Sequence, residues 1–139
     1  MTTTTPRKVF INLPIKDLNR SVTFFETLGF TFNQQFTDET TSMMNINEDA
    51  YAMLISEPRF QTFTPKAIAD AATTSEVLIA ISAESREEVV EFVNRAFAAG
   101  GTPAREQEDH GFMLGWSFQD LGHHIWEVVW MDPSFIQEG

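Results

Sequence analysis

The histidines and carboxylates near the end of the chain are the first candidates for chemistry. The stretch DLGHHIWEVVWMDP, residues 120–133, contains His123, His124 and Glu127. Imidazole and carboxylate groups are common zinc ligands. On a strand that rises about 3.3 Å per residue, His123 and Glu127 share a face but lie roughly 13 Å apart, while His124 points to the other side. Unless the turn folds back, these side chains cannot bind one ion, so we expect both histidines to fill the turn before the last strand.

Two other polar side chains lie within apolar strand sequence. Asn12 shares a strand face with Phe10 and should bond either to a neighbouring strand or to a ligand, because an unpaired buried amide is costly. Glu127 could act as a general base, or accept a hydrogen bond from a ligand cation or hydroxyl. The structural alternative for Glu127 is a salt bridge to Arg105. We favour the ligand-facing interpretation of Glu127 and leave both open for Asn12.

Composition limits the class of protein. The 139 residues, 42% of them hydrophobic, suit a single domain with a sizeable core. With 20 acidic and 9 basic residues, the net charge of −11 disfavours nucleic acid and anionic membranes as partners. The absence of cysteine excludes thiolate chemistry. Neither a membrane span nor a signal peptide is apparent, so we expect a cytoplasmic protein.

The chain divides into halves with the same predicted order of elements. Each half begins with a strand (8–15 and 76–83) followed by a helix. The first helix begins after Asp17 and ends at Gly29; the second begins with Ser85 and Glu88 in capping-box spacing and ends at a Gly pair. Three short strands follow in each half, at 30–36, 41–47 and 50–56, and at 102–107, 110–118 and 123–131.

We therefore predict an α+β fold of two tandem βαβββ modules that form a cupped mixed β-sheet with helices on the outer face. Residues 1–139 form one domain in this prediction. Module one spans about 7–57, a linker or flap spans 58–75, and module two spans about 76–132. The linker is longer than an ordinary loop, so we expect a short helix near 66–72.

Two motifs, FINLPIKDLNRSVTFFETLGF in the first half and DLGHHIWEV in the second, resemble those of the vicinal oxygen chelate superfamily. This group includes glyoxalase I, extradiol dioxygenases, fosfomycin and bleomycin resistance proteins, and predicted lactoylglutathione lyase-like proteins. The resemblance implies a homodimer whose cupped sheet holds a divalent metal through the first and last strands of both modules.

The resemblance locates the four metal-ligand positions in this sequence. The first-strand positions fall on Phe10 and Leu78, and the last-strand position of module two falls on Glu127. Its module-one counterpart is Ala52, or Met53 after a one-residue shift that we prefer for its size. Only the carboxylate is a suitable ligand, because a thioether binds hard or borderline ions poorly. We therefore expect no cofactor, with a divalent metal as the alternative.

The predicted function is a small-molecule binding protein of the glyoxalase and bleomycin-resistance type, with a largely apolar cup and a degenerate metal site. One alternative is a metal-dependent glyoxalase-like lyase or dioxygenase, in which Glu127 binds the metal with residues outside the four aligned positions, such as Glu57 or His110. For His110 itself we favour a surface role. A second alternative is a metal-free enzyme with Glu127 as general base. The expected ligand contacts share one feature, a place on a strand that lines the cup: Asn12, Trp116, Phe10, Met53 and Leu78.

Overall fold

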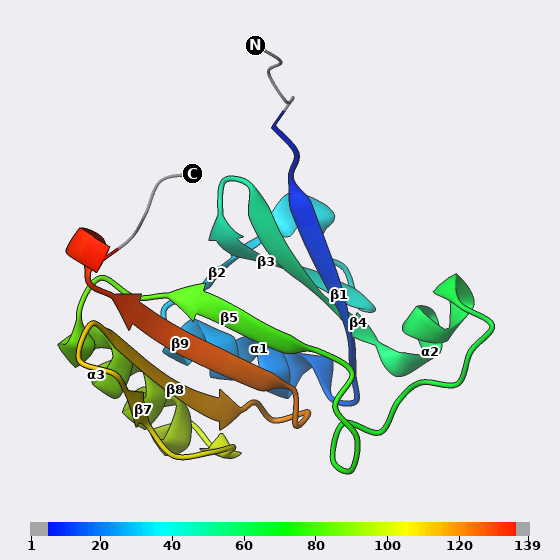
Figure 1. The fold of residues 1–139 in the computed structure, drawn as a ribbon. Coiled ribbons are helices and arrows are strands. Elements are labelled where there is room, and N and C mark those ends of the chain that lie inside the picture. Colours follow the sequence, from blue (N-terminus) through cyan, green and yellow to red (C-terminus); the bar gives the residue numbers. More distant parts are fainter. Residues whose placement is uncertain (1–5, 136–139) are drawn as a thin grey trace. The chain divides into compact units, whose positions relative to one another are not determined.

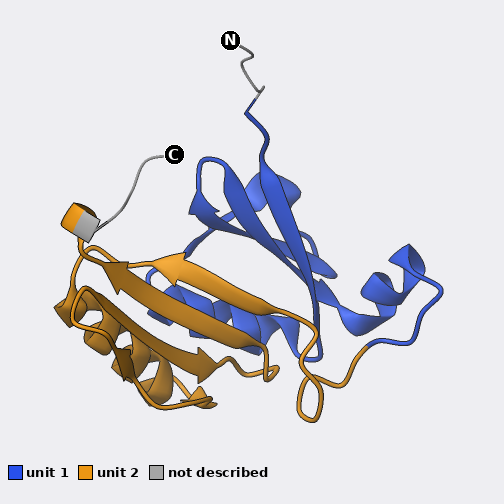
Figure 2. Ribbon diagram, viewed as in Figure 1, with its two compact units in different colours: residues 1–68 blue, residues 69–139 orange. Residues whose placement is uncertain are grey.

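The computed structural model of the protein describes residues 6–135, which form two compact units (Figure 2). The first unit extends through Ile68, and the second begins at Ala69. Each unit has one mixed sheet and one longer helix, in the order strand, helix and then antiparallel strands (Figure 1). The predicted α+β class with tandem βαβββ modules is confirmed.

The sheet of the first unit has the strand order β1-β4-β3-β2. Its strands are β1 (Val9–Ile15), β2 (Thr31–Asn33), β3 (Thr41–Asn47) and β4 (Ala50–Ser56). β1 runs parallel to β4, and the other neighbours are antiparallel. The strand predicted at 30–36 is shorter, because the Asn33 side chain accepts a hydrogen bond from the Gln35 N–H and begins the 3-10 helix η1 (Gln34–Phe36).

Helix α1 (Leu18–Thr27) packs on one face of this sheet. Its ends follow the predicted signals, since Asp17 accepts a hydrogen bond from the Arg20 N–H and Gly29 has a φ of 101°. The core of the unit consists of buried apolar side chains from the helix, its C-terminal end and the facing strands: Leu13, Ile15, Phe24, Phe25, Leu28, Met44, Ala52 and Leu54.

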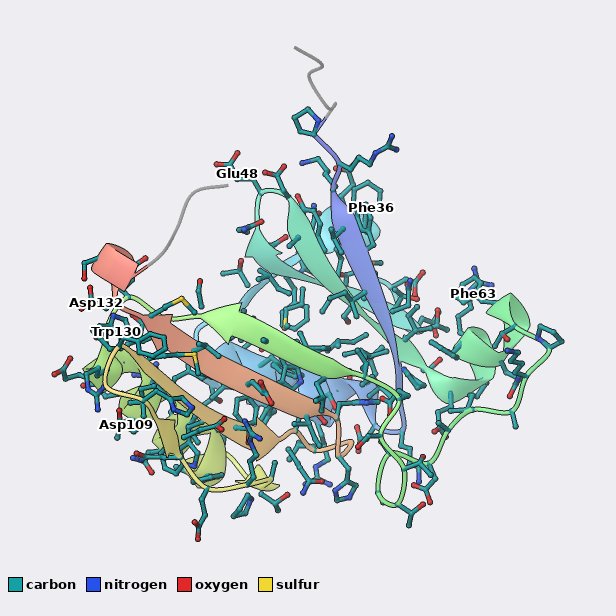
Figure 3. All side chains as sticks on the ribbon, in the orientation of Figure 1. Phe36, Glu48, Phe63, Asp109, Trp130 and Asp132 are labelled. Atoms are coloured by element: carbon teal, nitrogen blue, oxygen red, sulfur yellow. The ribbon has the colours of Figure 1, made fainter. Side chains whose placement is uncertain are left out.

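The segment after β4 differs from expectation. Helix α2 (Glu57–Phe60) and the 3-10 helix η2 (Gln61–Phe63) follow β4 directly, and Phe63 is exposed (Figure 3). The short helix predicted near 66–72 is wrong, because no helix is assigned there. Pro58 explains the earlier start, since proline fits the first turn of a helix, where its missing N–H costs nothing.

The sheet of the second unit has the order β5-β9-β8-β6, with β7 also paired to β8. Its strands are β5 (Leu78–Ser82), β6 (Thr102–Pro103), β7 (Glu108–Asp109), β8 (Met113–Gln119) and β9 (Ile125–Met131). β5 runs parallel to β9, and the other pairs are antiparallel. The strand predicted at 102–107 is therefore two short pieces, β6 and β7, separated by a connection at 104–107.

Helix α3 (Arg86–Ala98) covers one face of this sheet (Figure 1). The Ser85 side chain accepts a hydrogen bond from the Glu88 N–H, as the capping-box spacing predicted. Buried side chains from the helix and strands form the core: Ile79, Val89, Val93, Ala96, Leu114, Phe118, Trp126 and Val128. A 3-10 helix, η3 (Pro133–Phe135), follows β9. Over residues 6–135, no helix is long and apolar enough to cross a membrane.

Candidate functional site

The sheet face of the second unit that points away from α3 carries Glu127. Paired residues on neighbouring strands point to the same face. Glu127 on β9 pairs with Ala80 on β5 and with Ser117 on β8, and Val129 pairs with Gly115 in the next row. The side chain of Glu127 is 26% exposed. Its carboxylate therefore lies on the sheet face that α3 does not cover, with the small residues Ala80 and Ser117 as its direct neighbours.

Arg105 connects two carboxylates on this face. Its guanidinium Nη2 lies 2.7 Å from Glu108 Oε2 and 4.0 Å from Glu127 Oε1. Glu108 pairs with Gly115, so it shares the face of Glu127. The salt bridge that the sequence offered as a structural alternative for Glu127 is thus present, although the shorter contact of Arg105 is with Glu108.

Ser117 is the site residue that the sequence analysis missed. It is 1% exposed, and its hydroxyl oxygen is buried without a hydrogen-bond partner among residues 6–135. Leaving a buried hydroxyl unsatisfied costs about 1–3 kcal/mol. The sequence signal that could have identified Ser117 is a small polar residue between Trp116 and Phe118 in an otherwise apolar strand. In the structure it pairs with Glu127, the only carboxylate of β9. The serine is buried beside the carboxylate, so a polar pair lies on this face.

The first unit also has a sheet face without a helix. Asn12 on β1 pairs with Met53 on β4, which pairs with Met43 on β3. Asn12 is exposed on this face. In the adjacent row, Phe10 is 49% exposed and stacks on Tyr51 with ring centroids 5.2 Å apart. The predicted contacts Phe10, Asn12 and Met53 therefore share one surface.

Strand register also decides which residue corresponds to Glu127 in the first unit. In the repeat alignment Asn12 corresponds to Ala80, and their partners across the parallel pairs are Met53 and Glu127. Ala52, the other candidate, is fully buried on the face that α1 covers. Met53 is thus the counterpart of Glu127.

Trp116 lies on the opposite face from Glu127. It pairs with the buried Val128, and its ring meets Phe97 of α3 edge-on at 5.5 Å between centroids. Leu78 pairs with Ile125, two residues before Glu127, so it lies on the same face as Glu127. Its side chain is 57% exposed. The structure brings Leu78 and Glu127 onto one surface and does not bring Trp116 to it.

The DLGHH turn is organised by Asp120, a second residue that the sequence analysis passed over. Its buried carboxylate accepts hydrogen bonds from the Gly122 and His124 amides and from Trp126 Nε1, at 2.9, 3.0 and 2.9 Å. Burial raises the pKa of Asp120, against the opposing effects of His124 and of these hydrogen bonds. An Asp two residues before a Gly is typical of such a turn, in which the side chain bonds the backbone.

Both histidines of this motif occupy the turn, as predicted. His123 adopts a φ of 69°, and the buried ring of His124 lies with Nδ1 2.6 Å from Glu76 Oε1. His110 is half-exposed at the surface, with Nε2 3.5 Å from Glu108 Oε1. Among residues 6–135, no group of three or more His, Asp or Glu side chains could hold a metal ion. The donor set therefore does not fit a divalent metal centre.

A second interaction in this unit fixes β7 to the start of α3. Arg86 pairs with Asp109 and donates to the Gly111 carbonyl, and its guanidinium lies 5.5 Å from the ring centroid of Trp130. Figure 3 labels Asp109 and Trp130. The hydrogen bond from Arg86 lowers the pKa of Asp109. This pairing holds the strand that carries Glu108.

Comparison with known proteins adds to this geometry. Residues 7–47 match the model of the bleomycin resistance protein-like N-terminal family. No curated protein matches the sequence. A hypothetical protein from S. aureus is similar in structure, with 26% identity, 91% of this chain and 94% of that chain covered, and a TM-score of 0.76.

Two further structures have lower identity. A glyoxalase-related enzyme from Fulvimarina pelagi has 22% identity, 91% and 88% coverage of this chain and of that one, and a TM-score of 0.77. The fosfomycin resistance protein FosX from Mesorhizobium loti has 14% identity, 96% and 97% coverage, and a TM-score of 0.63. The chain thus has the fold of the glyoxalase, bleomycin resistance and dioxygenase proteins, with a bleomycin resistance-like match in its first half.

Proposed function

We propose that the protein binds a small organic molecule, as a member of the glyoxalase and bleomycin-resistance type with a degenerate metal site. The observation that carries this proposal is the exposure of large apolar side chains beside polar groups on helix-free sheet faces. Phe10 and Leu78 are about half-exposed on these faces, next to Asn12 and Glu127 respectively. Exposed apolar surface of this kind often marks a binding site.

The roles of the residues follow from their chemistry. Phe10, Met53 and Leu78 supply apolar surface, and methionine adapts its shape to a ligand because its side chain is flexible. Asn12 can donate and accept hydrogen bonds, whereas the ionised carboxylate of Glu127 can only accept them. Trp116 supports β8 from the helix side through its contact with Phe97. An apolar surface with few polar groups is typical of sites for organic ligands.

The proposed function requires no metal. Of the four positions that bind metal in similar proteins, those occupied by Phe10, Met53 and Leu78 offer no suitable ligand atom, and Glu127 alone is a carboxylate. The alternatives are a metal-dependent lyase or dioxygenase and a metal-free enzyme in which Glu127 transfers a proton. The homodimer implied by the resemblance stays a prediction.

The first test is metal content by inductively coupled plasma mass spectrometry on protein purified without a histidine tag. We expect only trace metal, and no saturating rise in melting temperature with Mn²⁺, Ni²⁺, Zn²⁺ or Fe²⁺, because a ligand that binds the native state must stabilise it. Stoichiometric metal that Glu127→Ala removes would contradict the proposal and favour the metal-dependent enzyme.

The second test is an aromatic fragment library observed by ¹⁵N–¹H correlation spectra. Fragments should shift the amide signals of β1, β4, β5 and β9, and Glu127→Gln should weaken binding. Glu91→Gln is the matched control, because Glu91 is exposed on α3 and the charge change is the same. Shifts confined to residues outside these strands would argue against the proposed site.

A further inference from the structure

The positions of Ser117, Glu127 and Arg105 suggest what kind of ligand the second unit takes. Glu108 lies on β7 and Glu127 on β9, and β8 pairs with both strands. Arg105 contacts both carboxylates, so its side chain must cross β8 on the face that carries Ser117. The guanidinium of Arg105, from the connection between β6 and β7, and the buried hydroxyl of Ser117 are therefore on the same face of β8.

The buried Ser117 hydroxyl could form a hydrogen bond with a bound ligand. A buried polar group in a native protein almost always has a hydrogen bond, and an exception calls for an explanation. Within the part of the chain that the structure describes, this hydroxyl has none, although Ser117 pairs with Glu127 across the strands. A ligand group with an N–H could donate to both the Ser117 oxygen and the Glu127 carboxylate once Arg105 moves aside.

The contact of Arg105 with Glu127 is easily broken. The guanidinium side chain is 58% exposed, and the contact of 4.0 Å is at the limit of an ion pair. Exposed ion pairs of this kind add little stability. Arg105 keeps its shorter contact with Glu108 at 2.7 Å, so it need not lose all charge pairing when it leaves Glu127.

We infer that Arg105 is an internal counterion of Glu127 that a ligand displaces, and that the site formed by Glu127 and Ser117 takes an organic cation with a planar amidinium or a similar N–H group. This inference rests on the proposed binding function and names the ligand class for it. Arg105 is shared between two carboxylates, Glu108 and Glu127, so the net negative charge of these three groups favours a cation over an anion. The guanidinium already held there has the N–H geometry that the ligand would reproduce.

Three probes with one aromatic body separate the charge classes: benzamidinium, benzamide and benzoate. Binding is followed by ¹⁵N–¹H spectra at low ionic strength, because salt screens the charge preference. We expect benzamidinium to bind more tightly than benzamide and to shift the amide signals of Ser117 and Glu127, with benzoate the weakest. Glu127→Gln should weaken benzamidinium binding about five- to tenfold, because charge-assisted hydrogen bonds are the stronger ones.

The variant that tests the role of Arg105 is Arg105→Gln, with Arg95→Gln as its control. Both remove one positive charge from the second unit, but Arg95 is exposed on α3. Arg105→Gln should tighten benzamidinium binding about two- to fivefold, the range set by a weak ion pair, and Arg95→Gln by less. Equal effects of the two variants would mean that only net charge matters, which contradicts displacement.

Ser117→Ala separates a ligand contact from a structural serine. A ligand-facing hydroxyl predicts weaker benzamidinium binding, by about threefold, with no loss of melting temperature. Loss of melting temperature with unchanged binding would overturn its place in the site. If neither these probes nor the fragment library shifts signals on β1, β4, β5 or β9, the proposed binding function itself fails. If fragments bind there but benzamidinium binds no better than benzamide or benzoate, only the ligand class fails.

Discussion

Ser117 lies directly opposite Glu127 in the ladder between β8 and β9, and its buried hydroxyl has no hydrogen-bond partner among the described residues. The same pair would be unremarkable if the serine donated to the carboxylate. Its free hydroxyl instead lowers the stability of the folded chain, because burial removes its hydrogen bonds to water. A loss of folding stability at such a position is typical of functional sites, where residues are selected for binding rather than for stability.

The first prediction concerns this cost. Ser117→Ala removes the unsatisfied hydroxyl and should raise the free energy of unfolding by about 1 kcal/mol, measured by urea denaturation. Thr37→Val is the contrasting control, because the Thr37 hydroxyl donates to the Asn33 carbonyl at 2.7 Å and accepts from the Met43 N–H at 3.3 Å. That change should lower stability by about 1 kcal/mol or more. Destabilisation by both variants would show that Ser117 has a structural hydrogen bond.

The second prediction concerns Asp120. Asp120→Ala leaves the Gly122 and His124 amides and Trp126 Nε1 without their acceptor, so it should lower the free energy of unfolding by about 3 kcal/mol or more. Chemical denaturation with fluorescence detection measures this loss, and native emission should move to longer wavelength if the turn opens around Trp126.

A matched variant for Asp120→Ala is Asp132→Ala. Asp132 also accepts hydrogen bonds in a local turn, from the N–H and hydroxyl of Ser134, but these bonds are exposed. We expect it to cost under about 1 kcal/mol. Similar losses from the two aspartates would mean that burial adds nothing to the importance of Asp120.

The third prediction is a dependence of stability on acid. The Arg86 hydrogen bond holds the pKa of Asp109 below its ordinary value of 3.8, so folding favours the ionised carboxylate. The resulting stabilisation is complete above the ordinary value and is lost as pH falls through the lowered one. Asp109→Asn should therefore reduce the loss of unfolding free energy between about pH 5 and pH 2. Glu26→Gln, an exposed change on α1, is the control, and an equal effect there would point to general charge reduction.

The sequence predicted most of the architecture because its signals are local. Asp17 and Ser85 cap the two longer helices, and Gly29 follows the first, as the sequence indicated. The break between β6 and β7 was missed, because it depends on which residues pair with β8 rather than on the composition of 102–107.

The candidate site was only partly predictable. Alternation along β9 puts Glu127 and the buried Trp126 on opposite faces of the sheet. It could not tell which face of β8 joins that of Glu127, because a shift of one residue between strands exchanges the faces. The sequence therefore favoured Trp116 as a ligand contact, whereas pairing brings Ser117 to Glu127. The bridge by Arg105 depends on three strands and a connection, which no local pattern encodes.

The last prediction compares Trp116 with Leu78 to decide whether Trp116 contacts a ligand or packs against α3. Trp116 is half-buried against Phe97 of α3, so Trp116→Ala should lower the free energy of unfolding by about 2–3 kcal/mol and leave benzamidinium binding at the Glu127 face unchanged. Leu78 is 57% exposed beside that face, so Leu78→Ala should cost under about 1 kcal/mol and weaken binding. Denaturation and fragment titration on both variants give the comparison. Weakened binding in Trp116→Ala at near-native stability would return Trp116 to the ligand site and remove the physical basis for placing that site on the helix-free face.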